Sequence, residues 1–406
     1  MQAVDAGYRD DNIKNAKGRL SCQYCEDPKE QGFMQILVLN WRDIRHPEAG
    51  GAEINIHEQA KRWVEWGHRV TMFTARPRGH KFRDNINGIE IFRMGGRFSV
   101  YPWAIFVYLL VLRKRTDVIL DIENGIPFFT PLYSRKPKVL LMHHLHQDQF
   151  LIEMGSIVGR IGRFLERIIV PILYRSSKIV AVSHSTADRK RGALYKGSDL
   201  EIDVIHNGLD HSLYGSGKQE FPEPTIIYLG RLKAYKRLPL LIKIMPAVRK
   251  QVPGVTLIIA GDGDALSEVE AEVDRLGVGD FVRFAGRVSE KEKIDLLQRA
   301  WVMATPSMNE GWGVTVIEAN ACGTPAVAYR VPGLDESIAH CRSGLLAESD
   351  EEFAQHLVSI LNDPKLRQKL SQGAVEWAAA FDWDETAREM LKALEASAPW
   401  LTSRDC

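Results

Sequence analysis

The residues best suited to chemistry lie in segment 306–325, where two glutamates flank a glycine-containing turn. Glu310 precedes Gly311-Trp-Gly313, and Glu318 lies on a predicted helix that begins at Val314. Apolar runs on both sides predict the order strand, loop, helix, strand. The first turn of this helix would present unpaired N–H groups to an anion, and the carboxylates would accept bonds from hydroxyls. The pattern indicates a phosphorylated, polyhydroxylated ligand, although a turn with two solvated glutamates has the same spacing.

Basic residues at a second predicted strand end fit the same ligand. Gly230 and Arg231 follow the apolar run 225–229, and Lys236 stands just before another predicted helix. A guanidinium and an ammonium there would suit a diphosphate leaving group, although isolated Arg and Lys side chains are usually solvated. A nucleotide base is expected near a further strand end, at Arg287 and Val288.

Another glycine turn, Gly50-Gly51, separates the predicted strand 34–39 from an amphipathic helix that ends near Trp66. Two glycines let the backbone approach a ligand closely and free N–H groups for a diphosphate. The three-glycine dinucleotide fingerprint is missing, so a nicotinamide cofactor is not indicated. A plain loop is the alternative.

Polar residues after three other predicted strands are candidates for binding a second substrate. They are Trp41 and Arg42 after the first strand, Glu123 and Asn124 after 118–121, and His143 and His144 after 139–143. Glu123 and Asn124 would equally fit a capped turn. Adjacent histidines in an extended segment point apart, so a shared metal ion is not expected.

The composition bounds the class of protein. A chain of 406 residues accommodates two domains, and a formal charge of +1 gives no electrostatic footprint for nucleic acid. Five cysteines, an odd number, fit a reducing compartment, and the pair Cys22 and Cys25 lacks the other ligands of a zinc site. We read no secretory signal or membrane span, so we expect a cytoplasmic protein.

Alternating strand and helix patterns predict an α/β fold with two doubly wound domains. We expect a polar leader over 1–33, an N-terminal domain over 34–211, a linker over 212–224, a C-terminal domain over 225–384 and a final amphipathic helix within 385–406. Ligands of such domains bind beyond the carboxyl ends of the strands, which places the site in the cleft between the domains.

The stretch from Glu310 to Pro325, with glutamates at 310 and 318, resembles the donor-binding signature of family-4 retaining glycosyltransferases. Gly230-Arg-Leu with Lys236 is similar to the family's phosphate-binding pair, and Gly50-Gly51 to its N-terminal glycine loop. The resemblance covers nearly everything after Met34. It implies the GT-B fold, two Rossmann-like domains with the active site between them. The implied reaction is a retaining transfer of a sugar from a UDP- or GDP-sugar to a hydroxyl, without a metal ion or another cofactor.

The resemblance also implies roles for single residues. We expect Glu318 at the donor ribose, and His144, with His143 as second choice, near the reacting sugar or the acceptor. The expected catalytic residues are His144, Arg231, Lys236 and Glu310. The expected donor site comprises Gly50, Gly51, Gly230, Arg231, Lys236, Arg287, Val288, Glu310, Gly311, Gly313, Val314 and Glu318. The less specific acceptor site comprises Trp41, Arg42, Glu123, Asn124 and His143.

Several alternatives remain open at this stage. A nucleotide-sugar epimerase, a phosphorylase or a non-catalytic sugar-nucleotide-binding protein would share the architecture, and the acceptor could be a sugar, a sugar phosphate, a lipid-linked sugar or a small metabolite. Peripheral membrane contact is suggested by the aromatic, apolar segment 100–112, followed by basic residues 113–115, and by the basic amphipathic segment 157–170. A core-facing helix with a solvated basic face is the alternative for the second segment.

Overall fold

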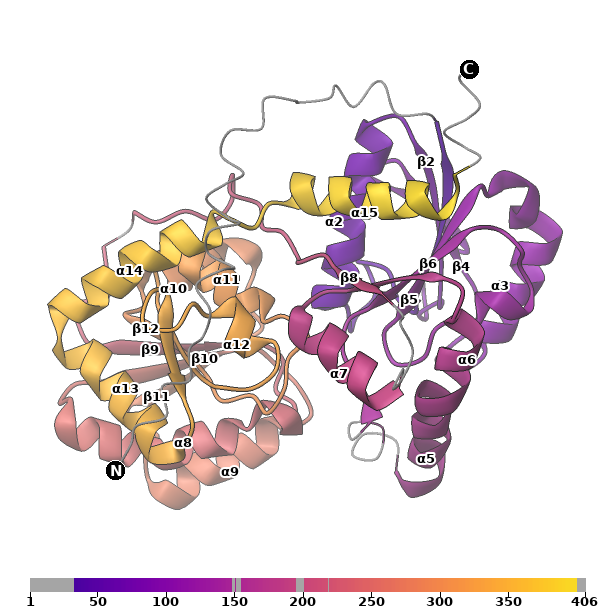
Figure 1. The fold of residues 1–406 in the computed structure, drawn as a ribbon. Helices are drawn as coiled ribbons and strands as arrows, with labels where there is room; N and C mark the ends of the chain where they lie inside the picture. The colour runs from indigo at the N-terminus through magenta and orange to yellow at the C-terminus, as the bar shows by residue number, and fades with distance from the viewer. Residues whose placement is uncertain (1–32, 148–149, 151–154, 195–200, 218, 400–406) are drawn as a thin grey trace, which may run out of the picture.

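The computed structural model describes residues 33–147, 150, 155–194, 201–217 and 219–399. Two α/β domains lie side by side, the N-terminal one coloured indigo to magenta and the C-terminal one mostly orange (Figure 1). Each domain is built on one sheet with helices packed around it, so the predicted pair of doubly wound domains is confirmed. The predicted leader, apart from Phe33, and the Cys22 and Cys25 pair lie outside the described residues.

The N-terminal sheet has the strand order β3-β4-β2-β1-β5-β6-β7-β8 and is parallel except for the β3–β4 pair. Its strands are β1 Gln35–Leu39, β2 Arg69–Thr74, β3 Arg83–Ile86, β4 Ile89–Arg93, β5 Val118–Glu123, β6 Lys138–Met142, β7 Lys178–Ala181 and β8 Ile202–Val204. The helices are α2 Gly51–Glu65, α3 Val100–Val107, α5 Ser156–Phe164, α6 Val170–Tyr174 and α7 His184–Leu194. Wider helical turns extend α3 through Tyr108–Leu112 and join α5 to α6 through Leu165–Ile169.

The C-terminal sheet is parallel throughout, in the order β11-β10-β9-β12-β13-β14. Its strands are β9 Thr225–Leu229, β10 Thr256–Ala260, β11 Val282–Gly286, β12 Val302–Thr305, β13 Ala326–Tyr329 and β14 Gly344–Ala347. The helices are α8 Leu238–Gln251, α9 Leu266–Leu276, α10 Glu290–Arg299, α11 Val314–Ala321, α12 Leu334–Ser337, α13 Asp350–Asn362 and α14 Pro364–Ala378. A last helix, α15 Trp383–Ser397, follows.

Apolar runs produced most of these strands because a parallel sheet covered on both faces buries the side chains of its inner strands. The predicted strands at 69–74, 89–93, 225–229, 256–260 and 326–329 coincide with β2, β4, β9, β10 and β13. β3 was not predicted because this edge strand is short and polar, with only Ile86 buried. β8 is three residues long and was likewise missed.

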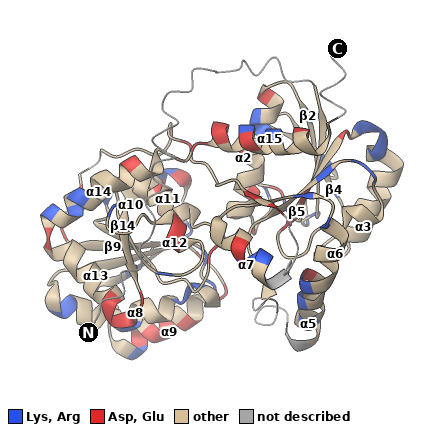
Figure 2. Cartoon of the chain, viewed as in Figure 1, with Lys and Arg blue, Asp and Glu red and all other residues tan. Residues whose placement is uncertain are grey.

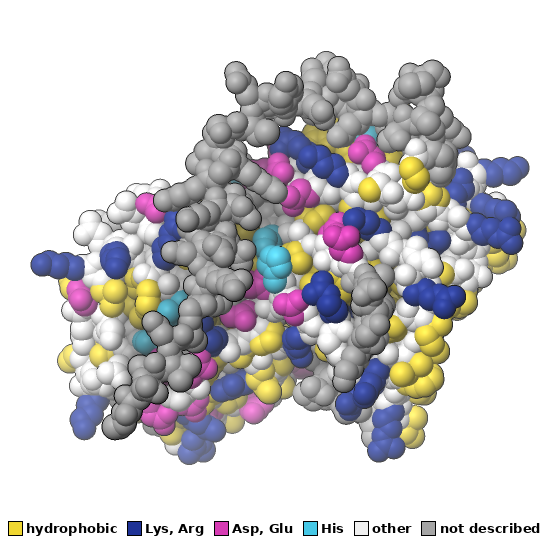
Figure 3. Space-filling model, viewed as in Figure 1, with side chains coloured by type: hydrophobic (Ala, Val, Ile, Leu, Met, Phe, Trp, Pro, Cys, Tyr) yellow, Lys and Arg dark blue, Asp and Glu magenta, His cyan; other side chains and the backbone are white. Residues whose placement is uncertain are grey.

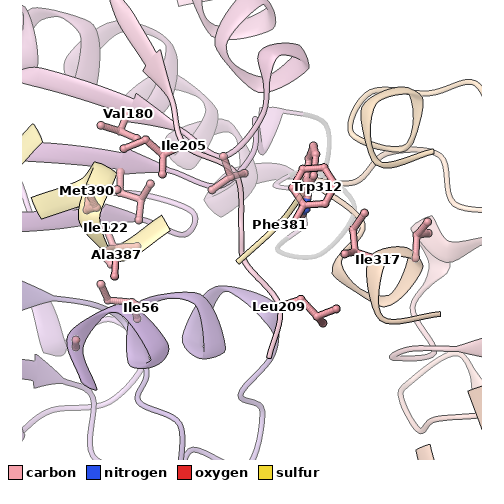
Figure 4. Packing of buried hydrophobic residues seen from close by; sticks show 14 of the residues in the cluster. Ile56, Ile122, Val180, Ile205, Leu209, Trp312, Ile317, Phe381, Ala387 and Met390 are labelled. Carbon is pink, nitrogen blue, oxygen red and sulfur yellow. The ribbon is translucent and has the colours of Figure 1, made fainter. Parts of the chain in front are cut away.

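The last helix, α15, packs on the N-terminal domain (Figure 1). The indole N–H of Trp63 on α2 donates to the carbonyl of Ala387 over 2.9 Å, and the Thr386 hydroxyl donates to the carbonyl of His206 over 2.9 Å. Met390 and Ala387 lie among side chains of the N-terminal core such as Ile122 (Figure 4). The same buried cluster continues through Phe381 and Trp312 into the C-terminal domain, so one apolar core links the two domains.

Segments 100–112 and 157–170, whose composition suggested membrane contact, fold as helices that expose apolar side chains on their outer faces. On α5 the glycines 159 and 162 are buried, whereas Ile157 is 74% exposed and Ile161 is 55% exposed. This orientation contradicts the alternative of a core-facing apolar side. In α3 and its extension, Phe106 and Leu110 are also exposed. No helix in the described part of the chain is long and apolar enough to cross a membrane.

Candidate active site

The candidate site lies where the two sheets present their central strand ends to each other. In the N-terminal sheet the chain order reverses between β1 and β5, and in the C-terminal sheet between β9 and β12. Ligands of open parallel sheets bind at such switch points, beyond the carboxyl ends of the strands. The loops after these four strands carry most of the residues that the sequence had nominated.

Lys236 and Glu310 form an ion pair at the C-terminal switch point. Lys236 Nζ lies 2.5 Å from Glu310 Oε1, and each side chain is 14% exposed. Burial lowers the pKa of Lys236, but the attraction of Glu310 outweighs it and raises the pKa above its usual value. The ammonium is therefore charged at neutral pH. It is held beside the loop that carries Glu310.

Two helix N-termini come close to each other between the domains. A Cβ atom at Gly51, the first residue of α2, would lie 3.7 Å from Cγ2 of Val314, the first residue of α11. A Cβ atom at Gly50 would lie 3.7 Å from Cζ of Arg231. Helix N-termini carry partial positive charge, so these two ends and the exposed Arg231 guanidinium form a region suited to an anion.

The expectation that the Gly50 amide is free for a phosphate is wrong. Gly50 N donates to Glu53 Oε2 over 2.7 Å, as in a capping box, so the amides left for a ligand begin at Gly51. The other carboxylate oxygen of Glu53 accepts from Arg42 Nε at 3.2 Å and from Asn124 Nδ2 at 3.1 Å. Buried Glu53 thus orients the glycine turn and two candidate acceptor residues. Its place three residues after Gly50 was a sequence signal that we overlooked.

Two positions in the loop that carries Glu310 leave no room for a side chain. A Cβ atom at Gly311 would lie 2.5 Å from the carbonyl oxygen of His143 in the opposite domain. Gly313 has φ 81°, which favours glycine, and ends the loop at the start of α11. Between them, Trp312 stacks on His206 with ring centroids 4.2 Å apart. The two domains therefore meet through this loop.

The histidine segment lies on the other side of that contact. His143 is buried, and desolvation together with His144 lowers its pKa to about 3, so the ring is neutral. His144 is half-buried, and its ring centroid lies 3.7 Å from that of His146. The prediction that neighbouring histidines point apart agrees with these different environments.

Glu123 does not lie where an acceptor could contact it. Its side chain is fully buried, and Oε1 accepts from Lys190 Nζ over 2.7 Å. Lys190 Nζ also donates to Glu166 over 2.9 Å. Burial raises the pKa of Glu123 to about 7; Lys190 opposes the increase and Glu166 adds to it. This carboxylate belongs to a buried ionic group beneath the cleft, so we leave it out of the acceptor site.

Trp41 and Arg42 contact each other in the loop that follows β1. Arg42 Cζ lies 4.4 Å from the centroid of the Trp41 ring, and Arg42 Nη1 is 3.2 Å from Glu48 Oε2. The guanidinium is therefore held by stacking and by two glutamates, of which Glu53 is the buried one. Arg42 is fixed in place more firmly than a solvated arginine would be.

Glu318 lies deeper in the C-terminal domain than Glu310. It is buried on α11, where Oε1 accepts from Lys293 Nζ over 2.8 Å and from Tyr214 Oη over 2.9 Å. Burial raises the pKa of Glu318, and Lys293 opposes that shift. Both of these hydrogen bonds use Oε1, and Tyr214 belongs to the predicted linker.

The remaining donor candidates stand at the same edge of the C-terminal sheet. Gly230 follows β9 with φ 151°, and its carbonyl oxygen would lie 1.9 Å from a Cβ atom on Gly261. Arg287, exposed, and Val288, half-buried, follow β11. They lie two strands from Gly230 in the sheet, and their place at a nucleotide base stays a prediction.

One group in the described part of the chain has the composition of a metal site. The possible ligand atoms of His184, His206 and Glu336 lie within 4.8 Å of one another. Both oxygens of Glu336 already accept from the protein, including His184 N at 2.7 Å. This geometry favours a carboxylate bound to backbone amides, and we assign no metal to the group.

The sequence as a whole matches known families over most of its length. Residues 216–377 match the family described as Glycosyl transferases group 1, and residues 49–213 match the one described as Glycosyltransferase Family 4. The chain belongs to the group 1 glycosyltransferases. Each match coincides with one of the two domains, and the resemblance stated from the motifs is confirmed.

The similarity to individual proteins is lower, at 20 to 30% sequence identity in the examples that follow. D-inositol 3-phosphate glycosyltransferase of Segniliparus rotundus is 30% identical over 276 residues, which are 64% of this chain and about three fifths (61%) of that protein's length. Among solved structures, sucrose-phosphate synthase from Thermosynechococcus elongatus superposes with a TM-score of 0.75 at 20% identity, covering 88% of this chain and 97% of that one. Anabaena HepE in complex with UDP and glucose gives 0.69 at 20% identity, covering 89% and 100%. The two structures establish the GT-B fold of this group 1 glycosyltransferase.

Proposed function

We propose that this group 1 glycosyltransferase moves a sugar from a UDP- or GDP-sugar to a hydroxyl of its acceptor, with retention at the anomeric carbon and without a metal ion. The observation that carries the proposal is the convergence of positive groups on one stretch of the cleft. Arg231, Lys236 and the N-termini of α2 and α11 gather there from both domains. The complex of HepE with UDP and glucose supports a nucleotide-sugar ligand for this fold.

The chemistry follows from where charge develops. As the bond between the sugar and the diphosphate breaks, negative charge grows on the leaving phosphate, and positive groups fixed in place stabilise it. Lys236 stays protonated because Glu310 raises its pKa, and Arg231 is always charged. Together with the helix N-termini, they supply the stabilisation that a divalent ion would otherwise give.

The other residues would bind and orient the substrates. Glu310, fixed through Oε1 by Lys236, would accept hydrogen bonds from hydroxyls of the transferred sugar. Glu318 would bind the ribose of the donor. On the acceptor side, the candidates are Arg42 and Asn124, both held by Glu53, and the histidines at 143 and 144.

The test is a binding panel of UDP-, GDP- and ADP-sugars in EDTA, by calorimetry and thermal shift, followed by hydrolysis and transfer assays on each donor that binds. We expect one sugar nucleotide to bind in EDTA and to release its nucleoside diphosphate. Donor affinity without turnover would support the non-catalytic alternative. Formation of an epimer without acceptor would support an epimerase. A rate that collapses on chelation would refute metal independence.

We also propose that the N-terminal domain contacts an anionic lipid surface, which would favour a lipid-linked acceptor. Exposed apolar side chains and basic side chains occur together over α3 and α5, on the lower right of Figure 3. The exposed apolar residues include Trp103, Phe106, Leu109, Leu110, Ile157, Ile161, Phe164, Ile168 and Ile172, and the accompanying basic residues include Arg113, Lys114, Arg115, Arg160 and Arg167. A helix that buries glycines and exposes isoleucines fits a lipid interface better than water.

Vesicle sedimentation tests this surface. The wild-type protein should bind vesicles containing phosphatidylglycerol more strongly than pure phosphatidylcholine, and Ile161→Glu should weaken that binding about tenfold or more. Leu213→Glu, at an equally exposed leucine outside both helices, is the matched control and should bind as the wild type does. Equal sedimentation of all three proteins would refute the proposal. A stable dimer that Ile161→Glu dissociates would assign the surface to a second copy of the chain instead.

A further inference from the structure

Helix α7 of the N-terminal domain begins against the opposite domain. Its first backbone amide, His184 N, donates to Glu336 Oε2 over 2.7 Å, and the amide and hydroxyl of Ser185 both donate to Glu336 Oε1. The Ser185 hydroxyl also lies 3.0 Å from Asp335 Oδ1. Figure 1 shows α7 facing α12 between the domains, and Figure 2 shows the acidic α12 in red. The N-terminal cap of α7 is thus supplied by the other domain.

The same acidic segment is attached to the loop that carries Glu310. Glu310 N donates to the carbonyl of Pro332 over 3.1 Å, and a Cβ atom at Gly333 would lie 2.4 Å from the carbonyl oxygen of Glu310. One turn further along α7, Arg189 Nη1 donates to the side chain of Asn309 over 2.8 Å. Helix α7 therefore contacts the Glu310 loop directly and, through Glu336, indirectly.

Lys190, the residue after Arg189 on α7, is linked by hydrogen bonds to the histidine segment of the N-terminal domain. Lys190 donates to Glu166, and Glu166 accepts from His146 N over 2.9 Å and from Gln147 Nε2 over 2.6 Å. These bonds hold the segment that follows His143. A single helix therefore joins the Glu310 loop of the C-terminal domain to the histidine segment of the N-terminal domain.

We propose that Glu336 is a positioning residue that couples closure of the cleft to placement of the histidine segment. Its bonds to α7 exist only while the domains are together, so they stabilise the closed arrangement over an open one. A carboxylate at a helix N-terminus is favoured by the helix dipole and by charge-assisted hydrogen bonds. The inference rests on the proposed transfer reaction, for which closure would bring donor and acceptor groups together.

The decisive variant is Glu336→Gln, which keeps the size of the side chain but removes its charge and one acceptor oxygen. Turnover should fall about tenfold or more, the loss expected for charge-assisted bonds, while the Kd for the nucleoside diphosphate changes by less than about threefold. X-ray scattering with bound nucleotide should give a larger radius of gyration than the wild type. Arg189→Ala, which removes the second contact, should act in the same direction.

The matched control is Asp363→Asn, which weakens a helix cap within one domain. Asp363 accepts from Lys365 N and Leu366 N over 2.9 and 3.1 Å at the start of α14. This variant should lower Tm without changing turnover or compactness. Glu336→Gln with wild-type turnover and a wild-type radius of gyration would overturn the inference. An inactive wild type would refute the proposed function instead, and the scattering comparison would still test the coupling.

Discussion

Replacement of Lys236 by alanine tests the centre of the proposed mechanism. The ammonium lies 2.5 Å from Glu310 and the Lys236 side chain is 14% exposed, so the pair is poorly screened by water. Removing it would take away one cation that stabilises the leaving diphosphate. It would also leave the Glu310 carboxylate unpaired beside the same negative charge.

The expected loss follows from these two effects. Removal of one fixed donor to a developing oxyanion costs about 3 kcal/mol, or roughly a hundredfold to a thousandfold in kcat. The unpaired carboxylate of Glu310 adds to this loss. The double variant Lys236→Ala, Glu310→Gln should therefore lose kcat by a smaller factor than the product of the factors lost in the two single variants, because the two side chains act as a pair.

The assay is steady-state release of nucleoside diphosphate at saturating donor, with donor Kd measured separately by calorimetry. Lys233→Ala is the control, because Lys233 lies three residues away and forms an exposed ion pair with Asp264 at 2.8 Å. Such surface pairs contribute about 0–1 kcal/mol, so this variant should keep its activity. Near-normal kcat in Lys236→Ala would remove Lys236 from the mechanism and refute the reasoning.

Two further predictions concern buried groups. Glu318→Gln should raise the donor Kd about tenfold with little change in kcat, as expected for a lost charge-assisted bond to the ribose; unchanged affinity with a lower Tm would make Glu318 a structural partner of Lys293 and Tyr214 only. His143 should make stability depend on pH, because its pKa is about 3 in the folded protein against 6.5 as the usual value. Between pH 6.5 and 3 the unfolded chain binds a proton at His143 and the folded chain does not. The contribution of His143 to the free energy of unfolding is therefore complete above pH 6.5, and it is lost as the pH falls from 6.5 toward 3, by up to about 1.4 kcal/mol per pH unit. Urea unfolding at pH 7.5, 6 and 5 should show a smaller decrease in His143→Asn than in the wild type, and equal decreases would contradict the burial argument.

The sequence by itself determined the two sheets and the loops at their carboxyl ends. Buried parallel strands appear in a sequence as short, nearly continuous apolar runs, so β2, β9 and β13 were recognisable from local composition alone. Glycine turns and basic residues directly after strands marked the switch points, because the chain there must turn and free its amides. These local signals left a solvated pair of basic residues and a plain turn open, and the resemblance to family-4 glycosyltransferases was needed to nominate Lys236 and Glu310, which the structure places in contact.

Only the tertiary structure decided which polar residues face the cleft and which lie beneath it. Glu123 and Asn124 are neighbours after one strand, yet Glu123 is buried against Lys190 while Asn124 is held by Glu53 near the cleft. Successive residues of an extended segment point in opposite directions, and their partners come from 67 and 71 positions away in the chain. The partners of Glu336 could not be predicted from the sequence for the same reason. Its amide partners on α7 lie about 150 residues earlier, and they meet it only because the two domains pack together.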